Sequence, residues 1–172
     1  MSAIDILNRD TTAEAAPPST AAVQKDGDIL GRIGNLETRL ARTAREIDAA
    51  QAVRYRVFVD EMKAQLPLDA MRRQRDVDAY DAVCDHLLVL DRSIEGDPED
   101  QIVGTYRLLR QDVAVANGGF YSASEFEIEG LIAKHPDKRF MELGRSCVLP
   151  EYRTKRTVEL LWQGNCAYAL KH

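Results

Sequence analysis

The sequence predicts a mixed α/β (α+β) domain, and three observations support this fold class. Segments that alternate apolar and polar residues, as half-exposed strands do, are interleaved with segments whose apolar residues recur at helical spacing. The chain has 172 residues, 45% of them hydrophobic, which suits one domain with a stable core. Its three cysteines form no Cys-x-x-Cys pair, so neither disulfides nor a structural zinc ion is expected to hold the fold.

The N-terminal part is predicted to be a mostly disordered leader over residues 1–35. Residues 11–23 are rich in Ala, Thr and Pro, and residues 25–34 add three glycines and more charge. The folded domain is then expected to cover residues 36–172. Its first strand is expected at residues 36–40, where Leu36, Thr38 and Leu40 alternate with less apolar neighbours.

A helix is expected next, from Thr43 as N-cap to about Met62. Apolar residues recur at three-to-four-residue spacing along this segment. Glu46 follows Thr43 by three residues, which is a capping-box pattern. The charged and irregular residues 65–78 include Pro67 and predict a loop or a short helix.

The second half predicts a β-hairpin, a further strand and a final helix. The hairpin strands are residues 86–90 and 102–109, which are joined by a turn-rich segment. Ser124 with Glu127 is a second capping-box candidate, and residues 140–149 form a strand that Pro150 ends.

The final helix is expected over residues 157–172. Its expected apolar side carries Val158, Leu161, Trp162, Cys166 (or Asn165) and Ala169, and Trp162 is expected to pack against the sheet. Because no Gly or Pro ends this helix, a C-terminal portion is expected to follow His172 in the complete protein.

The overall charge and hydropathy disfavour several classes of protein. The net charge of −5 argues against general nucleic-acid binding, which depends on a basic face. No apolar run approaches the roughly 18 residues of a membrane span, and the first residues lack the features of a signal peptide. Together with the odd number of cysteines, this pattern favours a reducing, cytoplasmic location.

Six ionisable residues stand beside apolar runs, where charges are rarely buried unless they are paired. In an ideal strand Glu142 and Arg145 would face opposite sides, and a bulge at Gly144 would bring both to one face. The pattern predicts either a functional cluster or an ion-pair network that only braces the fold. The six residues are Arg54, Asp78, Asp81, Arg107, Glu142 and Arg145.

A basic segment lies where the last strand leads into the final helix. A helix N-terminus offers unpaired amides and partial positive charge, so Arg153, Lys155, Arg156 and Thr157 could hold a phosphate or an acidic partner. The alternative is a solvated basic turn. The segment lacks the glycine-rich pattern of nucleotide-binding loops, so neither nucleotide hydrolysis nor hydride transfer is supported.

The remaining nucleophile and metal-ligand candidates are weaker. Cys147 lies in a predicted strand without a histidine at a motif distance and is expected to be a small core residue. His86 and His135 have no partners at metal-ligand spacing, so no metal site is expected.

Four segments together resemble a known family, in the right order and with compatible spacing. They are RYRVFVDEM (54–62), DVDAYDAVCDHLLVLD (76–91), IVGTYRLLRQDVA (102–114) and MELGRSCVLPEYRTKRTVELLWQG (141–164). They resemble the ornithine-acyl carrier protein N-acyltransferases of ornithine-lipid synthesis. That family is similar to the acyl-homoserine lactone synthases, and both belong to the GNAT superfamily. The resemblance implies a GNAT-like, mostly antiparallel sheet flanked by helices, with its last strands beyond His172.

The resemblance extends to the charged residues named above. The synthase pattern of an Arg and a Phe four residues later matches Arg54 and Phe58, and its Asp-x-x-Asp pair matches Asp78 and Asp81. Its strand arginine matches Arg107, and its Glu-x-x-Arg matches Glu142 and Arg145. The tryptophan that the synthases carry after the Phe is absent, which argues against a lactone synthase.

The donor loop differs from the superfamily pattern. An Arg/Gln-x-x-Gly-x-Gly/Ala loop usually grips the pyrophosphate of coenzyme A, and residues 153–158 carry Arg156 and Val158 where small residues would lie. Added basic residues suit the single phosphodiester and acidic surface of an acyl carrier protein. The substitution therefore favours a carrier-protein donor.

The resemblance implies transfer of a (3-hydroxy)fatty acyl group from acyl carrier protein to the α-amine of L-ornithine. Glu142 is the candidate general base, with Arg107 and Arg145 at the reacting groups. Arg54, Phe58, Asp78 and Asp81 would bind the amino acid, and Arg153, Lys155, Arg156 and Thr157 the donor's phosphopantetheine. No bound cofactor is implied. Because the product is amphiphilic, peripheral contact with the inner face of the cytoplasmic membrane is compatible with this reading.

Two alternatives remain open at this point. One is an acyl-homoserine lactone synthase-like enzyme that uses S-adenosylmethionine. The other is a non-catalytic GNAT-like scaffold that binds carrier protein or a membrane surface.

Overall fold

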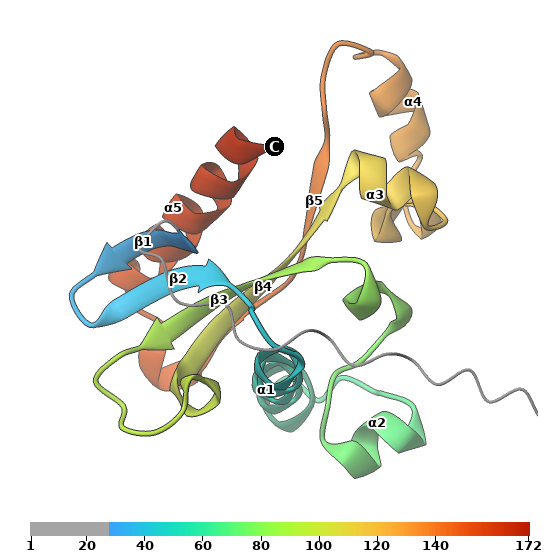
Figure 1. Cartoon of the computed structure of the whole chain (residues 1–172). Coiled ribbons are helices and arrows are strands. Elements are labelled where there is room, and N and C mark those ends of the chain that lie inside the picture. The colour runs from blue at the N-terminus through green and yellow to red at the C-terminus, as the bar shows by residue number, and fades with distance from the viewer. Residues whose placement is uncertain (1–27) are drawn as a thin grey trace, which may run out of the picture.

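Five strands form one antiparallel sheet in the order β1-β2-β3-β4-β5 (Figure 1). The computed structural model describes residues 28–172. The strands are β1 (Ile29–Ile33), β2 (Leu36–Leu40), β3 (Asp85–Asp91), β4 (Ile102–Arg110) and β5 (Met141–Val148). The mixed α+β fold class and the predicted hairpin of β3 and β4 are confirmed.

The two long helices, α1 (Ala44–Tyr55) and α5 (Lys155–Lys171), cover opposite faces of this sheet (Figure 1). Thr38 of β2 packs against Gly164 of α5, whereas its neighbour Arg39 forms an ion pair with Glu46 of α1. Because successive strand residues point to opposite faces, the two helices cannot lie on the same side. Three one-and-a-half-turn helices complete the fold: α2 (Leu68–Arg73), α3 (Gln111–Ala116) and α4 (Ile128–Ala133).

Strand β1 lies inside the segment that the sequence predicts to be a leader. The prediction is wrong for residues 29–33, and residues 1–27 lie outside the described residues. The glycines that suggested disorder have structural roles. Gly34 adopts a φ of 61° in the two-residue turn that pairs Ile33 with Leu36. Gly31 packs closely under α5, where an added Cβ would come 3.1 Å from Leu160 Cδ1.

The predicted helix over residues 43–62 is one helix that changes type. Regular α1 passes into a π-helix at Arg56–Glu61. Thr43 is the N-cap as predicted, and its hydroxyl accepts from the Glu46 amide at 3.1 Å. The Glu46 carboxylate does not return to the Thr43 amide. It accepts instead from the Arg42 amide and from Arg39, so it ties β2 to α1.

The second capping box, Ser124 with Glu127, is not formed. Ser124 ends a 3₁₀ turn, Tyr121–Ser124, and its hydroxyl donates to the Tyr121 carbonyl at 2.9 Å. Helix α4 begins only at Ile128. The serine is satisfied within its own turn and is not available to cap a helix.

Helix α5 begins at Lys155, with Thr154 as its N-cap, and it is rotated from the expected orientation: Leu161 and Asn165 are buried as expected, but Val158 and Trp162 are not. Val158 and Trp162 are 50% and 55% exposed. The buried side carries Thr157, Leu160, Leu161, Gly164, Asn165 and Tyr168. The small Gly164 decides the orientation because it lets the helix axis approach the sheet more closely than the tryptophan side could.

Gly164→Ala is expected to lower the free energy of unfolding by about 1 kcal/mol. The new Cβ would come 3.0 Å from both Leu87 Cδ2 and Thr38 Oγ1, which are fully buried. Overpacking costs roughly 1–3 kcal/mol, which exceeds the gain of about 1 kcal/mol in helix propensity. Gly130→Ala in α4 is the control, because its Cβ would meet nothing within 4 Å and should stabilise slightly. Urea denaturation of both variants tests this, and shifts of the same sign would contradict it.

Two hydrophobic clusters hold the fold together. The larger joins the sheet to α1 and α5. The smaller, formed by Leu109, Ala114 and Phe120, fastens the segment that carries α3 and α4 to the end of β4. Tyr80 and Cys84 pack against this smaller cluster, so it fixes one side of the pocket described below. No helix among residues 28–172 combines the length and hydrophobicity needed to cross a membrane.

Candidate active site

A buried ion-pair network of three arginines and three aspartates lies between α1 and the end of the sheet where β3 begins. At its base is Arg54, whose side chain is fully buried. Arg54 Nε lies 3.0 Å from Asp76 Oδ2, and Arg54 Nη2 lies 2.8 Å from Asp81 Oδ1. A buried arginine with two carboxylate partners is compensated in charge, which makes its burial tolerable.

The local sequence orients Asp78 and Asp81. They bracket a 3₁₀ turn, Ala79–Ala82, as a capping box: Asp78 accepts from the Tyr80 amide at 2.8 Å and Asp81 from the Asp78 amide at 3.0 Å. Arg107 of β4 then lies 2.5 Å from Asp78 Oδ1 and 3.3 Å from Asp81 Oδ1. The turn therefore fixes both carboxylates toward the sheet.

The pKa of the Asp78 carboxyl lies below its ordinary value. Burial pushes this pKa up, and the hydrogen bond from Arg107 with the charges of Arg107 and Arg145 outweighs burial. A carboxyl whose pKa is lowered on folding adds stability above its unfolded pKa. That contribution is lost as the pH falls through the lowered value.

Arg145 completes the network through a β-bulge in β5. The sequence places this bulge at Gly144, but Gly144 pairs regularly with Arg107, and Arg145 and Ser146 together oppose Tyr106. Arg145 itself takes the left-handed conformation, with φ of 49°. Its guanidinium thereby reaches Asp76 and Asp78, each at 3.1 Å.

Asp76 is the network residue that sequence reasoning missed. It is buried, and its amide donates to the Gln51 carbonyl of α1 at 3.1 Å. Glu142, which the sequence grouped with the three arginines, takes no part in these ion pairs. The signal for Asp76 was its position two residues before Asp78, on the same side of an extended segment.

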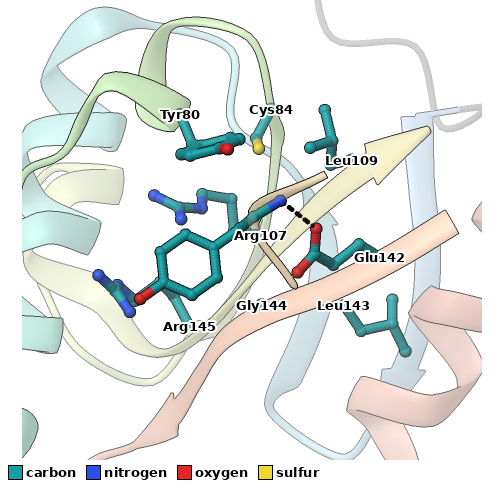
Figure 2. A pocket seen from close by; sticks show the side chains of 9 residues that line it. Tyr80, Cys84, Arg107, Leu109, Glu142, Leu143, Gly144 and Arg145 are labelled. Carbon is teal, nitrogen blue, oxygen red and sulfur yellow. Dashed lines mark hydrogen bonds between the residues drawn. The ribbon is translucent and has the colours of Figure 1, made fainter. Parts of the chain in front are cut away.

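A cavity of about 210 Å³ opens beside this network, at the start of β5 (Figure 2). Arg107, Arg145 and Glu142 all line it. The bulge in β5 places Glu142 and Arg145 on the same face of the strand, as the sequence predicts. Cys84 and Tyr80 form the opposite wall, seen at the top of Figure 2. The complete lining is Tyr80, Cys84, Arg107, Leu109, Tyr121, Glu142, Leu143, Gly144 and Arg145.

Glu142 is held by the turn that follows α3. Its Oε2 accepts from the Tyr121 amide at 2.8 Å, the dashed bond in Figure 2, and its Oε1 from the Ser122 amide at 3.1 Å. The Ser122 hydroxyl also donates to Oε1. The carboxylate therefore has a fixed orientation at the cavity wall.

Two tyrosines stack on the two cavity arginines. The Arg107 guanidinium lies 5.6 Å from the centre of the Tyr80 ring, and the Arg145 guanidinium lies 5.5 Å from that of Tyr121. The two rings meet edge to face at 5.6 Å. Each contact is a cation–π interaction that restrains a guanidinium already engaged by aspartate.

The other predicted amino-acid-binding residues do not line the cavity. Arg54 and Asp81 lie buried behind it, and Phe58 of the π-helix packs at the edge of the main core. The Asp78 side chain is 25% exposed and stands between Arg107 and Arg145. Of the residues matched by the family pattern, the structure thus brings Arg107, Glu142 and Arg145 together at the cavity.

The predicted donor-binding residues lie at the opposite end of β5, around the start of α5. Arg153 forms a two-pronged ion pair with Glu61 of the π-helix, at 2.6 and 2.5 Å. Lys155 and Arg156 are exposed. Thr157 is fully buried and its amide donates to the N-cap Thr154, so the structure removes Thr157 from the set that could touch a donor.

Burial governs the ionisation of Cys84, Cys147 and His86. Burial raises the pKa of Cys84 to about 11 and that of Cys147 to about 12, so both remain thiols. Burial lowers the pKa of His86, whose Nε2 donates to the Asp81 carbonyl at 3.0 Å and so supports the network. Within residues 28–172 no three His, Cys, Asp or Glu side chains are grouped as metal ligands.

Comparison with known proteins places this arrangement in a family. Residues 53–163, more than half of the chain, match the acetyltransferase (GNAT) domain family. An L-ornithine N(alpha)-acyltransferase of Agrobacterium fabrum is 72% identical over 171 residues, covering 98% of this chain and 58% of that protein. One of the same name from Rhizobium meliloti is 70% identical, covering 100% and 56%. The chain thus spans little more than half the length of these relatives.

Two solved structures share the fold at low sequence identity. FeeM, an N-acyl amino acid synthase from uncultured soil microbes, has a TM-score of 0.54 at 12% identity, covering 79% of this chain and 65% of that one. The AHL synthase LasI has a TM-score of 0.51 at 14% identity, covering 79% and 66%. Since the GNAT match spans most of the described domain and the sheet and helices agree with it, the chain belongs to the acetyltransferase (GNAT) domain family.

Proposed function

We propose that this chain carries the amino-acid site of an N-acyltransferase that moves a (3-hydroxy)fatty acyl group from acyl carrier protein to the α-amine of L-ornithine. The observation that carries the proposal is the cavity in which Glu142 faces two arginines. The names of the relatives from Agrobacterium fabrum and Rhizobium meliloti support the choice of ornithine.

The charges around the cavity suit a basic amino acid. Three arginines balance three aspartates in the network, and Glu142 is an additional carboxylate on the cavity wall. Arg107 or Arg145 would bind the carboxylate of ornithine, since guanidinium groups match carboxylates in geometry. The partly exposed Asp78 would attract the side-chain ammonium. Asp81 is already paired with two arginines and would act only through Arg54 and Arg107.

The reaction needs a neutral amine, correct placement and little further activation, because a thioester is already reactive. Deprotonating an α-amine with a pKa of about 8 costs about 1.4 kcal/mol at pH 7, whereas a side-chain amine near 10.4 costs about 4.6 kcal/mol. The α-amine is therefore the easier nucleophile. Glu142, through a water molecule, is the proposed base that accepts its proton. The nitrogen attacks the thioester carbonyl, the C–S bond breaks, and the proton passes to the departing thiolate.

The donor is proposed to approach the start of α5. Arg153, Lys155 and Arg156 would bind the phosphodiester and acidic surface of the carrier protein, the first of them by exchanging Glu61 for phosphate. Such a surface acts mainly on association and weakens with salt.

The activity test uses two proteins: residues 1–172 alone, and residues 1–172 completed with the C-terminal remainder of the Agrobacterium fabrum relative. Each is incubated with acyl carrier protein thioester and ornithine, and products are identified by mass spectrometry. N-acylornithine from the completed protein is expected. A lactone formed only with S-adenosylmethionine would favour the synthase alternative. Carrier-protein binding without turnover by either protein would favour the scaffold.

Arg156→Glu in the completed protein is expected to lower kcat/KM for the carrier-protein donor about tenfold, because it reverses a charge at the docking surface. The rate with a short acyl-pantetheine thioester should change less than twofold, since that donor lacks the acidic protein. Arg45→Glu, an exposed arginine of α1, is the matched control. Equal losses with both donors would contradict a carrier-protein contact at Arg156.

A further inference from the structure

The turn that carries Tyr121 and Ser122 is fixed on both of its sides. Phe120, directly before it, is buried in the cluster with Leu109 and Ala114. Gly118 and Gly119, with φ of 92° and 101°, give the chain the conformation that brings Phe120 into this cluster. On the other side the turn donates three hydrogen bonds to Glu142. A turn held in this way is a rigid support for the side chain that it contacts.

The three hydrogen-bond donors are divided unequally between the two oxygens of the Glu142 carboxylate. Oε1 accepts from both the amide and the hydroxyl of Ser122, whereas Oε2 accepts only from the Tyr121 amide. An ionised carboxylate offers about four lone-pair positions, so Oε2 keeps one free. Glu142 lines the cavity, and a ligand or water bound there would be the partner for this free position.

The ionisable neighbours of Glu142 come from four parts of the chain. Arg107 lies on β4, Arg145 on β5, Tyr80 and Cys84 lie in and after the 3₁₀ turn before β3, and Tyr121 lies on the supporting turn itself. Both arginines are engaged by aspartates of the network. The only strong donors on the Glu142 carboxylate among residues 28–172 are therefore those of the turn.

We propose that Ser122 is a positioning residue for acyl transfer: its hydroxyl, with the amides of Tyr121 and Ser122, holds Glu142 so that Oε2 receives the proton of the attacking amine through the water molecule. This inference rests on the proposed function. The proton leaves the amine nitrogen as the N–C bond forms, and it later passes to the thiolate released when the C–S bond breaks. Ser122 exchanges no proton in either step.

The kinetic test compares Ser122→Ala with Ser122→Thr in the completed protein. Ser122→Ala is expected to lower kcat about tenfold while the KM for ornithine stays within twofold, because orientation is lost and binding is kept. Ser122→Thr restores the hydroxyl and should recover most of kcat. Ser124→Ala, which loses a bond within the turn but none to Glu142, should remain near wild type.

A second measurement does not depend on activity. Amide hydrogen exchange at Tyr121 and Ser122 is expected to be slow in the wild type and at least tenfold faster in Glu142→Ala, since the carboxylate holds both amides. Unchanged exchange, or Ser122→Ala with wild-type kcat, would overturn the positioning role. A wild type that never acylates ornithine, yet shows Glu142-dependent protection, would overturn the proposed function while leaving the contact established.

Discussion

Arg54→Met is expected to lower the free energy of unfolding by about 3–5 kcal/mol, a large part of the 5–15 kcal/mol typical of a domain. The methionine fills similar space but leaves the two buried carboxylates with one arginine each, Asp76 with Arg145 and Asp81 with Arg107. Removing one member of a buried ion pair exposes the full desolvation cost of the other. Urea denaturation followed by circular dichroism measures the change.

Arg75→Met is the matched control for this substitution. Arg75 also forms an ion pair with an aspartate, at 2.8 Å from Asp48, but neither side chain is buried: Arg75 is 28% exposed and Asp48 is 54% exposed. Exposed pairs contribute about 0–1 kcal/mol, so this variant should stay close to wild type. A similar loss in both variants would mean that burial does not govern the contribution of Arg54.

Glu142→Gln is expected to lower kcat at least a hundredfold in the completed protein, because general-base catalysis contributes typically 10²–10⁴-fold. The glutamine keeps the size of the side chain and one oxygen acceptor for the turn, so the fold and the KM for ornithine should change little. Initial rates between pH 6 and pH 9 measure the effect. The residual rate of the variant should keep rising as solution pH deprotonates the α-amine.

Glu151→Gln is the corresponding control. Glu151 is an exposed carboxylate just after β5, so its loss should leave kcat within twofold of wild type. Wild-type turnover by Glu142→Gln at every pH would contradict the role of Glu142 as base. The amine would then lose its proton directly to solvent.

Most strands were predictable from local pattern, by two different signals. Strand β2 and the helix start at Thr43 follow from alternation and from a capping residue, whereas β3 and β4 follow from apolar runs bounded by turn residues, because both faces of these two strands are covered. Strand β1 was missed because Gly31 and Gly34 resemble loop residues until α5 and β2 are in place. The buried face of α5 was predicted incorrectly for the same reason. Gly164 favours burial only because it packs closely against Thr38 and Leu87, which are far from it in the sequence.

The charged residues of the site were predictable as a group but not as pairs. Arg54, Arg107 and Arg145 were noticeable because they interrupt apolar runs. Their partners depend on a bulge whose position, Arg145–Ser146 and not Gly144, is set by pairing with β4. Glu142 therefore accepts hydrogen bonds from the Tyr121–Ser122 turn and pairs with no arginine of the network. Asp76 is the carboxylate that pairs with Arg145 instead. Contacts between distant segments cannot be read from spacing alone.

Under the proposed function, the buried network would both hold the fold together and form the back of the acceptor site. A change at Arg54, Asp76, Asp78 or Asp81 that altered the acceptor would also cost the protein its stability. Cys84, Leu109 and Leu143 line the cavity without joining any ion pair of the described chain. Relatives that use longer or shorter amino-acid acceptors in the proposed reaction are therefore expected to differ at these three uncharged positions. The ion-pair network behind them is expected to stay the same.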